Sequence, residues 1–191
     1  MCGRYLIEDD SFSKGLDITA LSKGIAGATK GEIFPTNIAP IILESGVEAA
    51  KWGFPHWKSS SAVINARSET ALEKNMFRKP LLERRCAIPS NGFYEWKRVN
   101  GQKKKDKFLL RMKDSKKLFM AGMMSIFKDA FGDEYSAFVI LTTAAVATAA
   151  EIHDRMPVIL LPEELDRWVC DTAFMEHALR RPGPDLLVVP A

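Results

Sequence analysis

The sequence has few of the residues from which disulfide frameworks and metal sites are built. It contains three cysteines (Cys2, Cys86 and Cys170) and three histidines. The cysteines lie far apart, no CxxC pair occurs, and a metal site would need nearly all of the histidines. This spacing argues against a disulfide framework and a structural zinc site, and it favours a reducing cytosol. We therefore expect no metal and no cofactor.

Long apolar runs and a strong net charge are also missing. No apolar run reaches the length that a membrane helix needs, about 18 residues, and the first residues lack the pattern of a signal peptide. The net charge is only +3, which permits nucleic-acid binding without demanding it. Hydrophobic residues make up 47% of the 191 positions, enough for one substantial core. Without repeats or linkers, we predict one domain over residues 1–191.

The hydrophobic pattern predicts an α+β fold whose middle is rich in strands. Strands are expected at 4–8, 38–43, 47–52, 62–67, 92–97, 108–112, 118–124 and 135–141, with a last extended segment at 186–189. Helices are expected at 11–27, 68–75 and 144–152, from 162 onward, and once more in the tail.

The second residue carries the most informative chemistry. A methionine followed by a small residue is normally trimmed, which leaves Cys2 with a free α-amine of pKa about 8 beside a thiol of pKa about 8.5. The amine can condense with an aldehyde to an imine, and the thiol can then close on the same carbon to give a thiazolidine. The alternative is that Cys2 is merely a small residue after the initiator methionine.

Two further segments place polar side chains where they could serve such a site. Asn65 and Arg67 point to the same side of a predicted strand, just before a predicted helix start that favours anions. The alternative is an asparagine in a turn and an arginine in a surface ion pair. Glu95 lies between aromatic residues, so it is either paired or desolvated with a raised pKa suited to acid/base work.

His153 and a run of lysines complete the candidates. His153 lies at a predicted helix end before a proline-led strand, where an imidazole can face a cleft. Lys103-Lys104-Lys105 and Lys107 follow the predicted Asn100-Gly101 hairpin turn. A solvated hairpin tip is the simpler explanation of these lysines, and an unspecific contact with phosphate is the alternative.

The motifs occur in a recognisable order along the chain. They are Met1-Cys2-Gly3-Arg4-Tyr5, Asn37-Ile38-Ala39-Pro40, Trp52-Gly53-Phe54-Pro55-His56-Trp57, Ile64-Asn65-Ala66-Arg67-Ser68-Glu69-Thr70, Arg85 to Pro89 with Gly92-Phe93-Tyr94-Glu95-Trp96, and His153-Asp154-Arg155-Met156-Pro157. In these segments, which span residues 2 to about 170, the chain resembles the SOS-response-associated peptidase (SRAP) family. It departs from that pattern at Ala121-Gly122-Met123-Met124, where the family has an aromatic-containing stretch.

The resemblance implies a β-barrel-like core with flanking helices, a DNA-binding groove, and covalent shielding of abasic sites in single-stranded DNA. It implies Glu95 as acid/base, His153 as an aid to imine formation, and Asn65 as the residue that orients Cys2 and the sugar. The expected DNA contacts are Arg4, Arg67, Trp57, Phe93, Trp96 and Thr142. For the tryptophans, core packing is the alternative. The expected partner is single-stranded DNA with abasic sites, and we expect a cytoplasmic, nucleoid-associated monomer that does not contact a membrane.

Two other functions remain open at the level of sequence. Class II glutamine amidotransferases also begin Met-Cys-Gly, although we find no glutamine-binding set early in this chain. A single-strand-binding module without covalent chemistry would use the same arginines and aromatics. The peptidase in the family name is most simply explained by removal of Met1, and a lyase-type reaction at the abasic site accompanies the crosslinking expectation.

Overall fold

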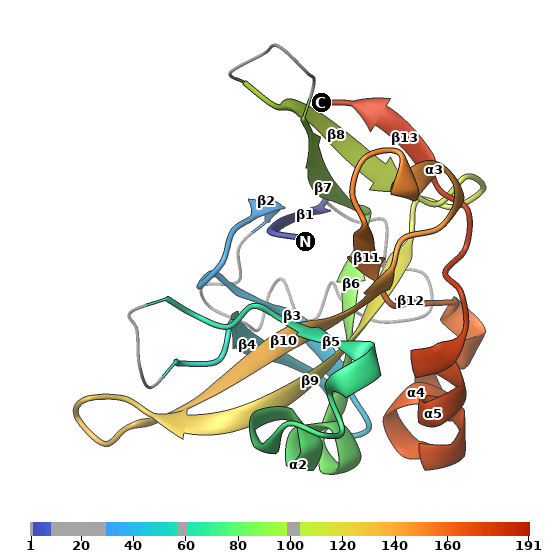
Figure 1. The fold of residues 1–191 in the computed structure, drawn as a ribbon. Helices are drawn as coiled ribbons and strands as arrows, with labels where there is room; N and C mark the ends of the chain where they lie inside the picture. Colours follow the sequence, from blue (N-terminus) through green and yellow to red (C-terminus); the bar gives the residue numbers. More distant parts are fainter. Residues whose placement is uncertain (1, 9–29, 57–60, 99–103) are drawn as a thin grey trace.

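The computed structural model describes residues 2–8, 30–56, 61–98 and 104–191 (Figure 1). Its strands are β1 (Arg4–Ile7), β2 (Gly31–Ile33), β3 (Ile38–Leu43), β4 (Gly46–Trp52), β5 (Asn65–Arg67), β6 (Arg85–Ser90), β7 (Gly92–Lys97), β8 (Asp106–Arg111), β9 (Leu118–Lys128), β10 (Glu134–Ala144), β11 (Arg155–Pro157), β12 (Ile159–Leu160) and β13 (Leu187–Pro190). Its helices are η1 (Ser68–Thr70), α2 (Asn75–Glu83), α3 (Ala147–Ala150), η2 (Pro162–Glu164), α4 (Leu165–Cys170) and α5 (Thr172–Arg180). The predicted helix at 11–27 and the Asn100-Gly101 turn lie outside the described residues.

Five strands close into a barrel in the order β10, β4, β3, β6 and β9, because β9 also pairs with β10. The β10–β4 pair is parallel and the other neighbours are antiparallel, so the barrel is mixed. The remaining strands and the short helices lie outside this ring (Figure 1). The predicted α+β fold with a barrel-like core and flanking helices is therefore confirmed.

Alternating residues of the ring strands separate two buried clusters. Met120 of β9, Trp52 of β4 and Phe138 of β10 belong to the cluster that fills the barrel, where the Trp52 and Phe138 rings stack with centroids 6.4 Å apart. Phe119, the neighbour of Met120, belongs to the second cluster, which includes residues of the outer helices. The period of two along each strand accounts for this division.

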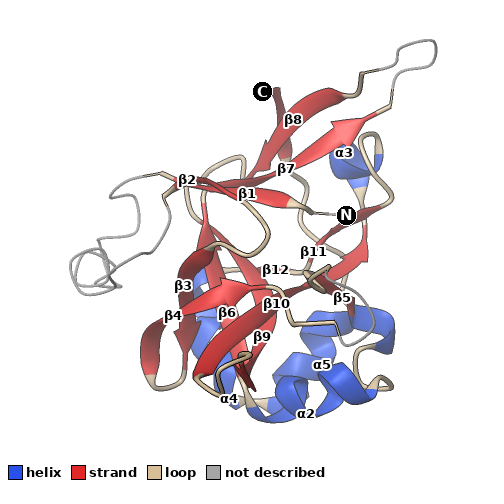
Figure 2. Cartoon of the chain, turned by 90° about the vertical axis from the view of Figure 1, so that its left-hand side faces the viewer, coloured by secondary structure: helices blue, strands red, loops and turns tan. Residues whose placement is uncertain are grey.

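Helices α2, α4 and α5 pack against the outside of the barrel (Figure 2). Arg85, at the start of β6, is buried and ties two of these helices to the barrel. Its guanidinium donates to the carbonyl oxygens of Leu81 at 3.1 Å and Trp168 at 2.6 Å. Burial lowers the pKa of Arg85, although nearby acidic groups oppose this shift.

Two predicted helices have different bounds in the structure. Residues 68–75 form only the 3-10 turn η1 and a further turn, and the helix α2 begins at Asn75, where Phe77 and Leu81 can bury one face against the barrel. The helix expected at 144–152 shrinks to α3, because β10 continues to Ala144, which pairs with β11.

A second sheet, in the order β13-β8-β7-β1-β2, lies at the end of the molecule away from α2, α4 and α5 (Figures 1 and 2). Tyr5 of β1 pairs with Phe93 of β7, and both side chains are fully buried in the barrel cluster. The Tyr5 ring meets Trp52 edge-on, with centroids 5.1 Å apart. This sheet therefore closes one end of the barrel and positions the N-terminal residues there.

Candidate functional site

Cys2 lies two residues before the start of β1 and is fully buried. Its Sγ contacts the backbone carbonyl oxygen of Arg4 at 3.6 Å. Burial, together with the charge of Glu95, raises the pKa of the Cys2 thiol far above its ordinary value. At neutral pH the buried residue therefore holds a protonated thiol, which is a poor nucleophile on its own.

Asn65 holds the backbone of Cys2. It begins β5, which pairs in parallel with β10 through Asn65 and Ile140. The Asn65 side-chain Nδ2 donates to the Cys2 carbonyl oxygen at 2.8 Å. Its Oδ1 is buried and has no hydrogen-bond partner among the described residues. The same amide thus fixes Cys2 and keeps an acceptor oxygen in the same region.

Glu95 reaches the site from the five-stranded sheet. It is 3% exposed and shares the inward face of β7 with Phe93. Its carboxylate is close enough for its charge to raise the pKa of the Cys2 thiol. The structure therefore brings Cys2, Asn65 and Glu95 together from three separate strands or strand ends.

His153 lies between α3 and β11, the strand that pairs with the end of β10. The imidazole Nδ1 accepts the backbone N–H of Arg155 at 3.0 Å and lies 2.7 Å from the Asp154 carboxylate. The first contact suits neutral imidazole with its proton on Nε2, and the second suits a proton on Nδ1. Either protonation state therefore has a partner, as a proton-transfer group requires.

Arg67 and Arg4 lie in different surroundings. Arg67 ends β5 and is exposed, opposite Thr142 of β10. Arg4 pairs with Tyr94 on the outer face of the second sheet, while its neighbour Tyr5 faces the barrel. The Arg4 guanidinium donates to Glu32 at 3.0 Å and lies 5.2 Å from the centre of the Trp96 ring. The two arginines thus reach the neighbourhood of Cys2 from different sides.

Two of the expected DNA contacts have side chains that do not reach the surface. Phe93 is fully buried because it shares the inward face of β7 with Glu95. Thr142 is also fully buried, and its hydroxyl donates to the Ala66 carbonyl oxygen at 3.4 Å. Trp96 is half-buried on the outer face, whereas Trp57 lies outside the described residues.

Sequence reasoning gave no role to Arg155, although its motif was recognised. The Arg155 guanidinium donates to both carboxylate oxygens of Glu69, at 2.5 and 2.9 Å, and to the Thr142 carbonyl oxygen at 2.5 Å. Its hydrogen bond lowers the pKa of Glu69. Arg155 therefore links the β5–η1 segment to β10, while its backbone N–H contacts His153. No spacing rule in the sequence pairs positions 69 and 155.

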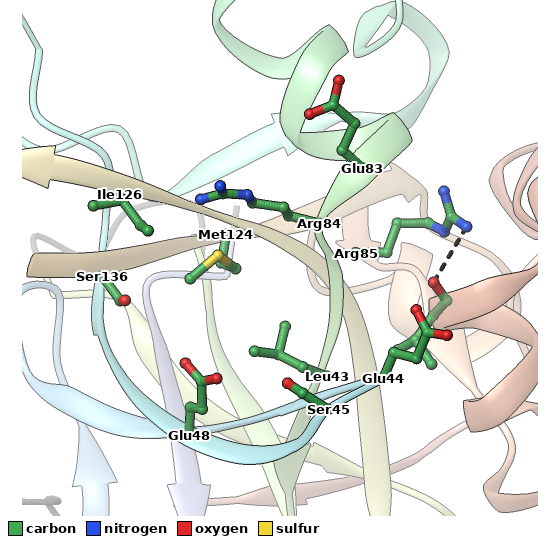
Figure 3. Close-up of a pocket in the computed structure, with 11 residues that line it drawn as sticks. Leu43, Glu44, Ser45, Glu48, Glu83, Arg84, Arg85, Met124, Ile126 and Ser136 are labelled. Carbon is green, nitrogen blue, oxygen red and sulfur yellow. Dashed lines mark hydrogen bonds between the residues drawn. The ribbon is translucent and has the colours of Figure 1, made fainter.

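A cavity of about 480 Å³ lies elsewhere, at the turn between β3 and β4 (Figure 3). Its lining includes Glu44, Glu48, Arg84 and Met124 and none of the residues that surround Cys2. Arg85 at its edge donates to the Val169 carbonyl oxygen at 3.2 Å. The volume of this cavity therefore does not identify the chemical site, which is defined by the contacts around Cys2.

No cluster of three or more His, Cys, Asp or Glu side chains suited to a metal ion occurs among the described residues. Within the same ranges, no helix is long and apolar enough to cross a membrane.

Comparison with known proteins identifies the family of this chain. The family model described as "SOS response associated peptidase (SRAP)" matches residues 1–185. The chain belongs to the SRAP family. Among its relatives, "Abasic site processing protein YoqW" of Bacillus subtilis is 35% identical over 184 residues, covering 88% of this chain and 80% of that protein. "Abasic site processing protein YedK" of Escherichia coli is 41% identical over 120 residues, covering 62% and 52%.

Solved structures show that the SRAP fold is shared along the whole chain. A protein from Bordetella bronchiseptica matches with a TM-score of 0.81 at 21% identity, covering 100% of this chain and 99% of that one. A protein from Bacteroides thetaiotaomicron matches with a TM-score of 0.79 at 24% identity, covering 98% and 92%.

Proposed function

We propose that this SRAP protein processes abasic sites by binding single-stranded DNA and linking it covalently to Cys2. The observation that carries the proposal is the environment of Cys2: the Asn65 amide donates to its carbonyl oxygen at 2.8 Å, and buried Glu95 lies within electrostatic reach of its thiol. The relatives named abasic site processing proteins supply the substrate class.

The reaction requires that Met1 be removed. While Met1 is attached, the Cys2 nitrogen is an amide whose lone pair is delocalised into the carbonyl group, so it cannot form an imine. After removal the nitrogen is an amine, a fraction of which is unprotonated at neutral pH. Self-processing or assisted removal of Met1 would account for the peptidase in the family name.

The proposed reaction joins the amine and the thiol of Cys2 to the aldehyde carbon of the abasic sugar, with loss of one water. An abasic sugar exchanges between a closed hemiacetal and an open aldehyde, and only the aldehyde reacts. The Cys2 amine adds to the aldehyde carbon, and the carbinolamine loses water to form an imine. The thiol then adds to the imine carbon while its proton passes to nitrogen, which closes the thiazolidine. The protonated thiol favours this order, because the amine is the more available nucleophile.

Glu95 and His153 divide the proton transfers in this proposal. Glu95 lies beside Cys2 and can open the hemiacetal, and during closure it can carry the thiol proton to the imine nitrogen. His153 is half-buried and has partners for two protonation states, which suits it to aid loss of water from the carbinolamine. The Asn65 Oδ1 can accept a hydrogen bond from the Cys2 amine and hold it for attack.

Two cations and one half-buried ring would hold the strand. Arg67 is exposed at the end of β5, next to Asn65 and on the same side of the strand. Arg4 and Trp96 form a second contact region on the outer face of the other sheet. Phosphate contacts position the strand and weaken with salt, whereas stacking on a tryptophan tolerates any base.

The proposal is tested with two oligonucleotides that differ only in one abasic site. After incubation with the processed protein, a denaturing gel should show a slower band only for the abasic strand. A complex that appears on native gels but never survives denaturation would leave a non-covalent binding module instead.

Substitution of Arg67 tests the contact with the phosphates. Arg67→Ala should weaken binding of single-stranded DNA and flatten the dependence of log affinity on log salt by about 0.7, the value of one phosphate contact. Titrations by fluorescence anisotropy at several salt concentrations measure both effects. Arg78→Ala, on exposed α2, removes the same charge and should leave the slope unchanged. Equal slopes for both variants would remove Arg67 from the DNA-binding surface.

A further inference from the structure

The outer face of the second sheet carries cations and aromatic rings in alternation. Arg4 lies 4.3 Å from the ring centre of Phe34 and 5.2 Å from that of Trp96. Lys107 on β8 lies 3.9 Å from the ring centre of Tyr94 and 6.0 Å from that of Trp96. Both cations therefore lie within cation–π distance of the Trp96 ring. This set of five residues is called the cation–aromatic face.

Lys107 is not a solvated lysine of a hairpin tip, as its sequence position suggested. Its side chain is 25% exposed, and its Nζ donates to both carboxylate oxygens of Glu32 at 2.9 and 2.8 Å. Strand pairing explains the position, because Trp96 and Lys107 are direct partners and project from the same face.

Glu32 is an anion clamped between two cations. One of its oxygens accepts from both Arg4 and Lys107, and the other accepts from Lys107. Burial by itself raises the pKa of Glu32, but the hydrogen bonds from Lys107 and Arg4 outweigh it and hold the pKa below its ordinary value. Its carboxylate therefore stays ionised at neutral pH and cancels one of the two positive charges.

We propose that Glu32 occupies a phosphate position on the cation–aromatic face, and that a DNA phosphate next to the abasic site displaces it from Lys107 and Arg4. This inference rests on the proposed function, and it adds Lys107, Tyr94 and Glu32 to the surface that holds the strand. A carboxylate and a phosphate bind to the same ammonium and guanidinium groups, and a phosphate presents more acceptor oxygens than a carboxylate. The rings of Trp96 and Phe34 offer a stacking surface to the adjoining base, whatever the identity of that base.

The distance to Cys2 supports a contact with a neighbouring nucleotide. Arg4 follows Cys2 by two residues, which can span at most about 7 Å. Because Tyr5 faces the barrel and Arg4 faces outward, the DNA strand would pass around the start of β1 onto the outer face. On this part of the path, a DNA phosphate must replace the Glu32 carboxylate at Lys107 and Arg4.

Removing the charge of Glu32 should strengthen binding, the opposite of what loss of a structural ion pair would do. With single-stranded DNA that contains no abasic site, Glu32→Gln should steepen the dependence of log affinity on log salt by about 0.7. The affinity of the variant divided by that of wild type should then be about fivefold higher at 0.1 M salt than at 1 M salt. Lys107→Gln should change both quantities by a similar amount in the opposite direction, and Lys107→Arg should restore them. Fluorescence anisotropy measures all three variants.

Matched substitutions on other parts of the surface separate local contact from net charge. Glu48→Gln and Lys79→Gln, at exposed positions of β4 and α2, change the net charge equally and should leave the salt slope unchanged. If Glu32→Gln weakens binding, Glu32 organises the cations and the displacement proposal is wrong. The proposal is also wrong if the variants match their controls. Crosslinking to an abasic strand at saturating DNA, measured in parallel, should persist in every variant. If wild-type protein itself forms no crosslink, the proposed function is wrong, whatever the salt slopes show.

Discussion

Replacing Cys2 with alanine should abolish the covalent complex with abasic DNA completely. The substitution leaves an amine that can still form an imine, but it removes the only atom that can close the thiazolidine, so no stable adduct accumulates. Denaturing gels of the processed protein with an abasic strand measure the yield. Non-covalent affinity for an intact single strand should be nearly unchanged, because the Cys2 side chain is fully buried.

Cys170→Ala is the matched control for this substitution. Cys170 is an exposed free thiol at the end of α4, remote from Asn65 and Glu95 in the fold. Its replacement should leave the crosslink yield at the wild-type level. A stable adduct formed by Cys2→Ala, or one lost in Cys170→Ala, would move the reaction to a different nucleophile.

Replacing Glu95 with glutamine should slow crosslinking by about 10²–10⁴-fold, the usual contribution of general acid–base catalysis. The amide keeps the shape of the side chain and loses its ability to exchange a proton. Rates come from the growth of the denaturation-resistant band with time, at saturating DNA. Affinity for the intact single strand should not change, since Glu95 is 3% exposed and faces Cys2 rather than the cation–aromatic face.

Glu95→Gln should also change the pKa of the Cys2 thiol. The charge of Glu95 raises the pKa of Cys2, so Glu95→Gln should lower that pKa and shift thiolate formation to lower pH. The rate of thiol alkylation at a fixed, mildly alkaline pH follows the thiolate fraction, and it should rise in Glu95→Gln when both proteins carry Cys170→Ala and share Cys86. Slow crosslinking together with an unchanged alkylation rate and a lowered melting temperature would make Glu95 a structural residue.

Local patterns predicted the strands better than the helices. The alternation of residues 92–97 gave β7 and put Phe93 and Glu95 on one face, and both statements hold. The pattern did not say which face is the core, so Phe93 was assigned to DNA although it is buried. The start of α2 depends on the burial of Phe77 and Leu81 against the barrel, a tertiary contact that the cap-like Ser68 does not reveal.

The chemistry of the side chains was enough to predict which residues matter around Cys2. Which residues they contact depends on long-range strand pairing. The hydrogen bond from Asn65 to Cys2 joins residues 63 positions apart, and no sequence period encodes it. Arg4 and Tyr5 point to opposite faces because they are neighbours in a strand, but only the packing of β1 decides that Tyr5 faces the barrel. Long-range pairing likewise brings Glu32 to Lys107, a contact that propensity and spacing do not predict.

The mass of the covalent adduct tests the central claim most directly. Intact-protein mass spectrometry, before and after incubation with an abasic oligonucleotide, should show an adduct that lacks Met1 and equals protein plus DNA minus one water. Protein that retains Met1 should bind the strand without forming the adduct, because its Cys2 nitrogen is an amide. An adduct that still carries the mass of Met1 would contradict attack by the Cys2 amine.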